Sequence, residues 1–192
     1  MTKGRIEAFS DGVIAIIITI MVLELHAPHG HEWADFRPLL PIFLCYVLSF
    51  ANVGIYWNNH HHMFQAVRHV GGWVLWANLH LLFWLSLMPF VTGLIGENEF
   101  AGVTVVLYVL DLMMCGFSYY LLVRALVSEH GPDSEFARTL GSDWKEKVSL
   151  VSYALAVPLA IYLPVAAMVL IGIVAALWIV PDRRFAHVRE KG

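Results

Sequence analysis

The sequence predicts an all-α, polytopic membrane protein with six transmembrane helices, folded as one domain over residues 1–192. Three observations predict this fold class. The chain is 59% hydrophobic and only 14% charged, which is too apolar for an ordinary soluble domain. It contains windows of about 20 apolar residues, the length of helix that crosses a hydrocarbon core of about 30 Å. Its lysines and arginines are concentrated in every second connection between those windows.

The windows follow one another along the chain with polar connections between them. The first begins just after Arg5, the third contains Pro89, which predicts a kink, and the fourth contains the acidic Asp111. A polar connection over residues 128–147 is too short to form a second domain. The predicted helices lie near residues 8–25, 39–58, 73–95, 101–127, 146–162 and 164–180.

The last two helices are the hardest to separate. Residues 148–180 run almost without charge, and Pro158, Tyr162 and Pro164 predict a tight turn between two short spans. A single span in this region, which would give five helices in all, is the alternative.

Positive charge predicts the orientation, because lysine and arginine favour the cytoplasmic side of a membrane. Eleven of the twelve lie before the first helix, between the second and third, in or beside the connection between the fourth and fifth, or after the sixth, and only Arg37 lies elsewhere. We therefore expect a multi-pass protein of the cell's inner (plasma) membrane with both termini cytoplasmic. Five spans would place Arg183 and Arg184 outside, so the charge pattern favours six.

Several classes of function are not expected. A net charge of -3 without a basic block does not resemble a nucleic-acid binder. Cys45 and Cys115 are far apart in apolar segments and predict neither a disulfide nor a zinc site. The run His60 to His62 does not predict a metal site either, since consecutive helical side chains diverge by about 100°. We expect no metal, no cofactor and no enzymatic activity.

The first predicted helix has two different faces. At about 100° per residue, Phe9, Ile16, Ile20 and Leu23 share an apolar stripe, and Gly12 and Thr19 lie on its border. Ser10 and Asp11 lie on other sides of the helix, with Asp11 about 140° around from Ile16. Charge and unpaired polar groups are costly in hydrocarbon, so Arg5, Ser10 and Asp11 must contact other helices.

Two hypotheses explain the apolar stripe. It can pack against other helices of the bundle, with the Thr19 hydroxyl bonded to its own backbone. Alternatively, several copies of this helix surround an axis, so that Ile16, Ile20 and Leu23 form a constriction that dewets and Thr19 lines the path beside it.

The motifs resemble those of the transmembrane protein 175 family, the endosomal and lysosomal potassium channels and their prokaryotic relatives. The likeness begins with Arg5-x-x-x-Phe9-Ser10-Asp11 and the isoleucine-rich run to Leu23-Glu24. It continues in Tyr56-Trp57-Asn58-Asn59-His60-His61, in Trp76-Ala-Asn78 and in Pro181-Asp182-Arg183-Arg184. It covers nearly the whole chain. His62 departs from the family pattern, in which a basic residue is expected.

This resemblance implies a homotetramer in the lipid bilayer, in which the first helix of each six-helix subunit lines a central pore for potassium and other monovalent cations. It implies modest selectivity for potassium over sodium, with Ile16 as the main constriction, Leu23 as a second ring and Thr19 as the layer linked to selectivity. Its structural polar network maps to Arg5, Ser10, Asp11, Trp57, and His60 or His61. The sequence contains no segment like TVGYG, so no carbonyl-lined filter of that kind is expected.

Asp111 is the other notable polar residue, because acids within membrane spans are commonly functional. We expect a buried hydrogen bond to a neighbouring helix, to Asn78, His80 or Asn52. The alternative is a proton-coupled transporter in which Asp111 and histidines such as His80 titrate.

Overall fold

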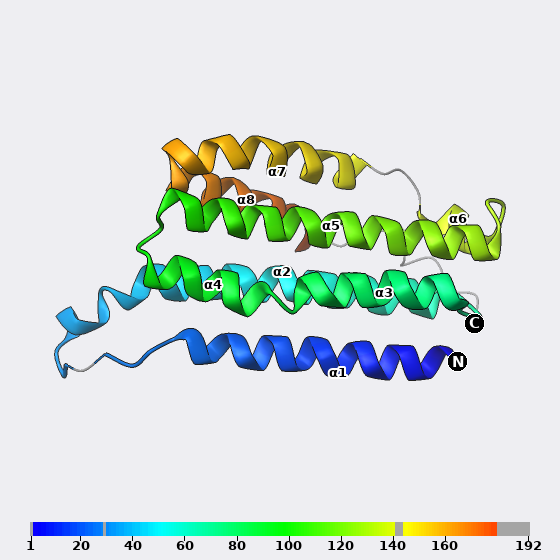
Figure 1. Ribbon diagram of the computed structural model, residues 1–192, viewed down its shortest axis with the longest axis horizontal. Helices are drawn as coiled ribbons and strands as arrows, with labels where there is room; N and C mark the ends of the chain where they lie inside the picture. The colour runs from blue at the N-terminus through cyan, green and yellow to red at the C-terminus, as the bar shows by residue number, and fades with distance from the viewer. Residues whose placement is uncertain (1, 29, 141–143, 180–192) are drawn as a thin grey trace.

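The protein is all-helical within the residues that the computed structural model describes, which are 2–28, 30–140 and 144–179 (Figure 1). This confirms the all-α part of the predicted fold class. The α-helices are α1 (Lys3–Met21), α2 (Leu39–Gln65), α3 (Gly72–Leu85), α4 (Met88–Glu97), α5 (Gly102–His130), α6 (Glu135–Leu140), α7 (Trp144–Tyr162) and α8 (Pro164–Ile179). Two short 3-10 turns, Val22–Glu24 and Trp33–Phe36, lie in the connection between α1 and α2.

Four stretches are long and apolar enough to cross a membrane: Lys3–Glu24, Leu39–Gln65, Gly72–Glu97 and Gly102–His130. They correspond to the first four predicted spans. The predicted turn after Tyr162 is present, since α7 ends there and α8 begins at Pro164. α8 is apolar but has only 16 residues. The fifth and sixth spans therefore remain a prediction, and Arg183 and Arg184 lie outside the described residues.

The third span is broken into α3 and α4, which fits the kink predicted from Pro89. Pro89 lies in the first turn of α4, where the missing N–H costs no intrahelical hydrogen bond. The hydroxyl of Thr92 is buried and donates to the carbonyl oxygen of Met88 (2.6 Å). This side-chain hydrogen bond supports the first turn of α4 after the break.

α2 extends seven residues beyond its predicted end at residue 58, because Gln65 is its last residue. The additional turns contain the polar run that ended the apolar window. His60 is held by Asn78 of α3, and His61 lies 2.8 Å from the side-chain nitrogen of Gln65 one turn later. Side-chain hydrogen bonds thus allow α2 to continue through polar residues that a prediction from hydropathy places outside the helix.

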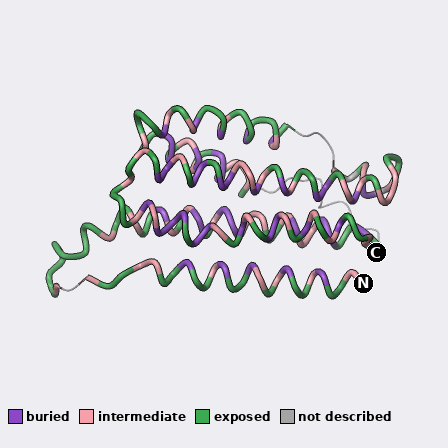
Figure 2. The backbone as a smooth tube through the Cα atoms, viewed as in Figure 1, coloured by how far each residue is buried: buried purple, intermediate pink, exposed green. Residues whose placement is uncertain are grey.

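α1 lies at one edge of the bundle and packs against α2, α3 and α4, whereas α7 lies at the opposite edge against α5 and α8 (Figure 1). The core between these edges is formed by large side chains, which include Leu81, Leu85, Met88, Tyr108 and Leu112. In Figure 2 the buried positions of α1 recur along one side of the helix, and exposed positions alternate with them. One face of α1 is therefore left uncovered by its own chain.

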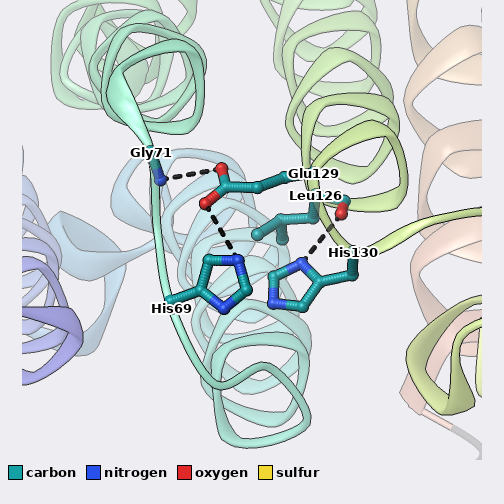
Figure 3. Close-up of polar contacts among 5 residues, drawn as sticks. All are labelled: His69, Gly71, Leu126, Glu129 and His130. Carbon is teal, nitrogen blue, oxygen red and sulfur yellow. Dashed lines mark hydrogen bonds and ion pairs between the residues drawn. The ribbon is translucent and has the colours of Figure 1, made fainter.

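The loop after α2 is fixed to the end of α5 (Figure 3). The backbone N–H of Gly71 donates to one oxygen of Glu129 (2.7 Å), and Nε2 of His69 lies 3.6 Å from the other. The ring of His69 contacts that of His130, whose Nδ1 donates to the Leu126 carbonyl (3.0 Å). These contacts hold the start of α3, and hence Asn78, in register with the rest of the bundle.

Candidate functional site

The two faces of α1 have different environments. The buried face consists of Ile6, Ser10, Ile14, Ile17 and Met21. On the other face, Ile16, Ile20 and Leu23 are 58%, 43% and 70% exposed. The candidate pore residues thus make little contact with their own subunit. Within one chain, this apolar stripe is only partly covered by other helices.

Thr19 lies on the exposed side among these aliphatic residues. Its hydroxyl donates to the carbonyl oxygen of Ile16 (2.9 Å), which is the backbone bond expected of a threonine within a helix. The hydroxyl proton is used in this bond, but the oxygen keeps lone pairs that accept hydrogen bonds or contact a cation. The bond to the backbone and a role beside an ion path are therefore compatible.

A groove of about 540 Å³ runs between α1 and α4. Ile16 and Ile20 line it from α1, and Phe90, Gly93 and Glu97 line it from α4. Gly93 accommodates the carboxylate of Glu24, because a Cβ at this position would collide with it. Sequence reasoning did not identify this contact. Its only signal was a glycine within an apolar helix.

Asp11 is held by Trp57 of α2. The indole Nε1 of Trp57 donates to an Asp11 carboxylate oxygen (2.9 Å), and the indole stacks on the ring of His61 with centroids 5.7 Å apart. No histidine bonds to Asp11 within the described residues. The charge at this position is therefore directed toward α2 and away from the apolar stripe.

Ser10 joins a separate, fully buried chain of hydrogen bonds. The amide nitrogen of Asn78 donates to the Ser10 hydroxyl oxygen (2.9 Å), and the amide oxygen of Asn78 lies 2.8 Å from Nε2 of His60. An amide oxygen only accepts, so Nε2 of His60 is the donor. Asn78 thereby connects α1, α3 and α2 at one point. It belongs to the quoted Trp76-Ala-Asn78 motif, but the role predicted for it was that of a partner for Asp111, together with His80 and Asn52 as alternatives.

Arg5 is not joined to these contacts within the subunit. It is exposed, and no side-chain hydrogen bond or ion pair involves it among the described residues. The start of α1 is fixed instead by Lys3, whose ammonium donates to the carbonyl oxygen of Gln65 (3.4 Å). The place of Arg5 in the network remains a prediction.

The prediction that Asp111 forms a buried hydrogen bond to a neighbouring helix is wrong. Asp111 is only 4% exposed, and neither carboxylate oxygen has a hydrogen-bond partner in the described part of the chain. Asn78 is occupied by Ser10 and His60, and Asn52 donates to the Leu48 carbonyl (3.0 Å). The ring of His80 accepts from the indole of Trp84 (3.2 Å). Partner choice depends on the rotation of each helix, which residue type alone does not specify.

Across the described ranges, no group of three or more histidine, cysteine, aspartate or glutamate side chains could hold a metal ion. The polar contacts around α1 consist of hydrogen bonds and ring stacking. These contacts anchor α1 on one side, and its other side is apolar.

Comparison with known proteins identifies the family. The family model of the endosomal/lysosomal potassium channel TMEM175 matches residues 5–89, which include the anchored face of α1 and its partners. A potassium channel of Chryseobacterium sp. (strain P1-3) is 50% identical over 184 residues, which cover 96% of each chain. The human endosomal/lysosomal proton channel TMEM175 is 36% identical over 80 residues, or 35% of this chain and 16% of that protein.

A solved structure agrees over nearly the whole chain. The crystal structure of a lysosomal potassium-selective channel TMEM175 homolog from Chamaesiphon minutus superposes with a TM-score of 0.75 and 26% sequence identity. The match covers 92% of this chain and 96% of that one. From the anchored α1, the matched family model and these relatives, we conclude that the chain belongs to the endosomal/lysosomal potassium channel TMEM175 family.

Proposed function

We propose that this chain is the subunit of a homotetrameric cation channel, permeable to potassium with modest selectivity over sodium. The observation that carries the proposal is the exposed apolar stripe of α1, formed by Ile16, Ile20 and Leu23 at the edge of the subunit. A stripe of this kind needs lipid or other copies of the chain to cover it. The relative that is 50% identical is named a potassium channel, which favours other copies around an ion path.

In this assembly Ile16, Ile20 and Leu23 form successive apolar rings. Rings of branched side chains gate by dewetting when the path is narrow. Thr19 adds a hydroxyl layer between them, and selectivity arises there from side-chain oxygens and pore width. The bond from Trp57 keeps the carboxylate of Asp11 behind the helix, so Asp11 has a structural role.

The channel lies in the cell's inner (plasma) membrane with both termini cytoplasmic. The positive charge of the connections supports this orientation, because Arg37 is the single lysine or arginine on the opposite side.

The proton-coupled transporter is less well supported. Asp111 lies on α5, which packs against α3, α4, α7 and α8, whereas α1 packs against α2, α3 and α4. His80 is bonded to Trp84 and not to Asp111. Neither carboxylate oxygen of Asp111 has a hydrogen-bond partner among the described residues, so no hydrogen-bonded relay begins at Asp111 there.

Cysteine modification tests the proposed path. Leu23→Cys should make potassium flux in proteoliposomes sensitive to a charged methanethiosulfonate reagent, because the modified side chain would obstruct the pore. Ile161→Cys is the matched control: Ile161 is 60% exposed on α7, far from α1, and its modification should leave flux unchanged. Equal sensitivity of the two variants would contradict a path along α1. The animal relatives are named proton channels, so a pH-sensitive dye is included to identify the permeant ion.

Thr19→Val should lower the potassium-to-sodium permeability ratio by about threefold, the effect of losing one weak hydrogen-bonding group. Thr19→Ser keeps the hydroxyl and should keep the ratio. Reversal potentials measured in mixed potassium and sodium solutions give the ratio directly. A valine variant with the wild-type permeability ratio would show that Thr19 does not determine the selectivity.

A further inference from the structure

A second cavity, of about 330 Å³, lies between α2, α5, α7 and α8, on the side of the bundle away from α1. All four helices contribute aromatic residues to its wall. The rings of Tyr56 and Tyr119 meet edge to face with centroids 6.2 Å apart. Trp178 is fixed by its indole N–H, which donates to the hydroxyl of Ser149 (2.8 Å). The volume is within the range of cavities that bind small ligands.

Polar groups without partners face this space. The hydroxyls of Tyr56, Tyr119 and Tyr153 and the amide of Asn59 line the cavity, and none has a hydrogen bond to another described residue. Tyr153 is only 7% exposed. A buried polar group without a partner costs free energy, most of all in a membrane where no bulk water replaces the bond. These groups open onto the cavity, and an occupant that forms hydrogen bonds would satisfy them.

Charges of both signs lie around the cavity. Glu146 lines the cavity from α7, and the ammonium of the buried Lys145 lies 5.7 Å from the centroid of the Trp178 ring in the cavity wall. Lys147 lines the cavity and is itself exposed, so it carries its positive charge at the mouth. An occupant that carries both a positive and a negative group matches these charges.

The position of the charged residues indicates a membrane lipid. Glu146 and Lys147 lie in the first turn of α7 and Trp178 in the last turn of α8, and α7 begins toward the end of the bundle that carries the N-terminus (Figure 1). Tryptophan is enriched at this depth, where headgroups lie. Leu150 and Val151 on α7 are each 59% exposed and give acyl chains an apolar surface next to the mouth.

We propose that this cavity binds the headgroup of a phosphatidylethanolamine-type lipid. The ammonium group donates to the hydroxyl oxygens of Tyr119 and Tyr153, and the phosphate faces Lys147. The three N–H donors of a primary ammonium suit these acceptors, whereas the quaternary ammonium of choline has no donor. The site is separate from the proposed ion path, so its test does not depend on channel activity.

Native mass spectrometry of the purified protein with equal amounts of phosphatidylethanolamine, phosphatidylcholine and phosphatidylglycerol tests the proposal. Wild type should retain the ethanolamine lipid preferentially. Tyr119→Phe and Tyr153→Phe keep the rings and remove only the hydroxyls, and each should lower this retention roughly fivefold, the effect of one hydrogen bond. Tyr46→Phe on α2, outside the cavity, is the matched control and should bind as wild type does.

Three results would overturn the proposal. Equal retention of ethanolamine and choline lipids by wild type would show that the headgroup is not recognised. Unchanged retention of the lipid by both phenylalanine variants would indicate that water, and not the lipid headgroup, occupies the cavity. Binding of free O-phosphoethanolamine as tightly as the lipid would assign the cavity to a soluble ligand. The elution profile of each variant on size exclusion confirms its fold.

Discussion

Replacing Ile16 with asparagine is expected to raise potassium flux through the reconstituted protein by about tenfold, which corresponds to lowering the barrier by about 1.4 kcal/mol. Ile16 is 58% exposed on the uncovered stripe of α1, where the proposed assembly has its narrowest apolar ring. An amide in each subunit would hydrogen-bond to water and keep the constriction wetted. Flux is measured in potassium-loaded liposomes under a fixed potential.

The control for this prediction is Ile161→Asn, the same change at a residue that is 60% exposed on α7. It places an equal number of amides on the opposite edge of the subunit and should leave flux at the wild-type level. If both variants conduct as wild type does, while their oligomeric state is unchanged, Ile16 does not form the constriction.

Replacing Asn78 with leucine is expected to destabilise the protein by about 2–5 kcal/mol. The change removes two hydrogen bonds and leaves the Ser10 hydroxyl and the His60 ring buried without a partner, and each such group costs about 1–3 kcal/mol. The midpoint of thermal unfolding in detergent should fall clearly. Because Asn78 connects α1 to α2 and α3, the oligomer should also dissociate more readily.

Asn58→Leu is the comparison for this substitution. Asn58 is an exposed amide on α2, and no hydrogen bond of its side chain occurs within the described residues, so its loss should change the midpoint little. Similar unfolding midpoints for the two leucine variants would mean that the buried hydrogen bonds of Asn78 do not determine the position of α1.

The division of α1 into two faces follows from the sequence because it depends on local geometry alone. The angle between two residues of one helix is set by their separation, so placing Asp11 away from Ile16 needed no knowledge of neighbours. The structure agrees: Asp11 contacts Trp57, and Ile16 is exposed. The membrane class and the first four spans follow for the same reason, since length and apolar composition are properties of single segments.

The contacts between helices could not be inferred in this way. Asn78 lies in a motif that the sequence made visible, yet its pairing with Ser10 and His60 requires three helices to meet at one depth. The hydrogen bond expected for Asp111 failed because the candidate partners are engaged elsewhere. The tyrosine-lined cavity arises where α2, α5, α7 and α8 meet, and no single segment indicates it.

By itself, the sequence determined that this is a helical membrane protein and which side of α1 is anchored and which is apolar, because helix periodicity and hydrophobic length act within one segment. Only the tertiary structure decided which polar groups are paired and which remain unpartnered around a cavity. Hydrogen-bond partners and cavities depend on the relative rotation and depth of packed helices, and these are set by the whole bundle.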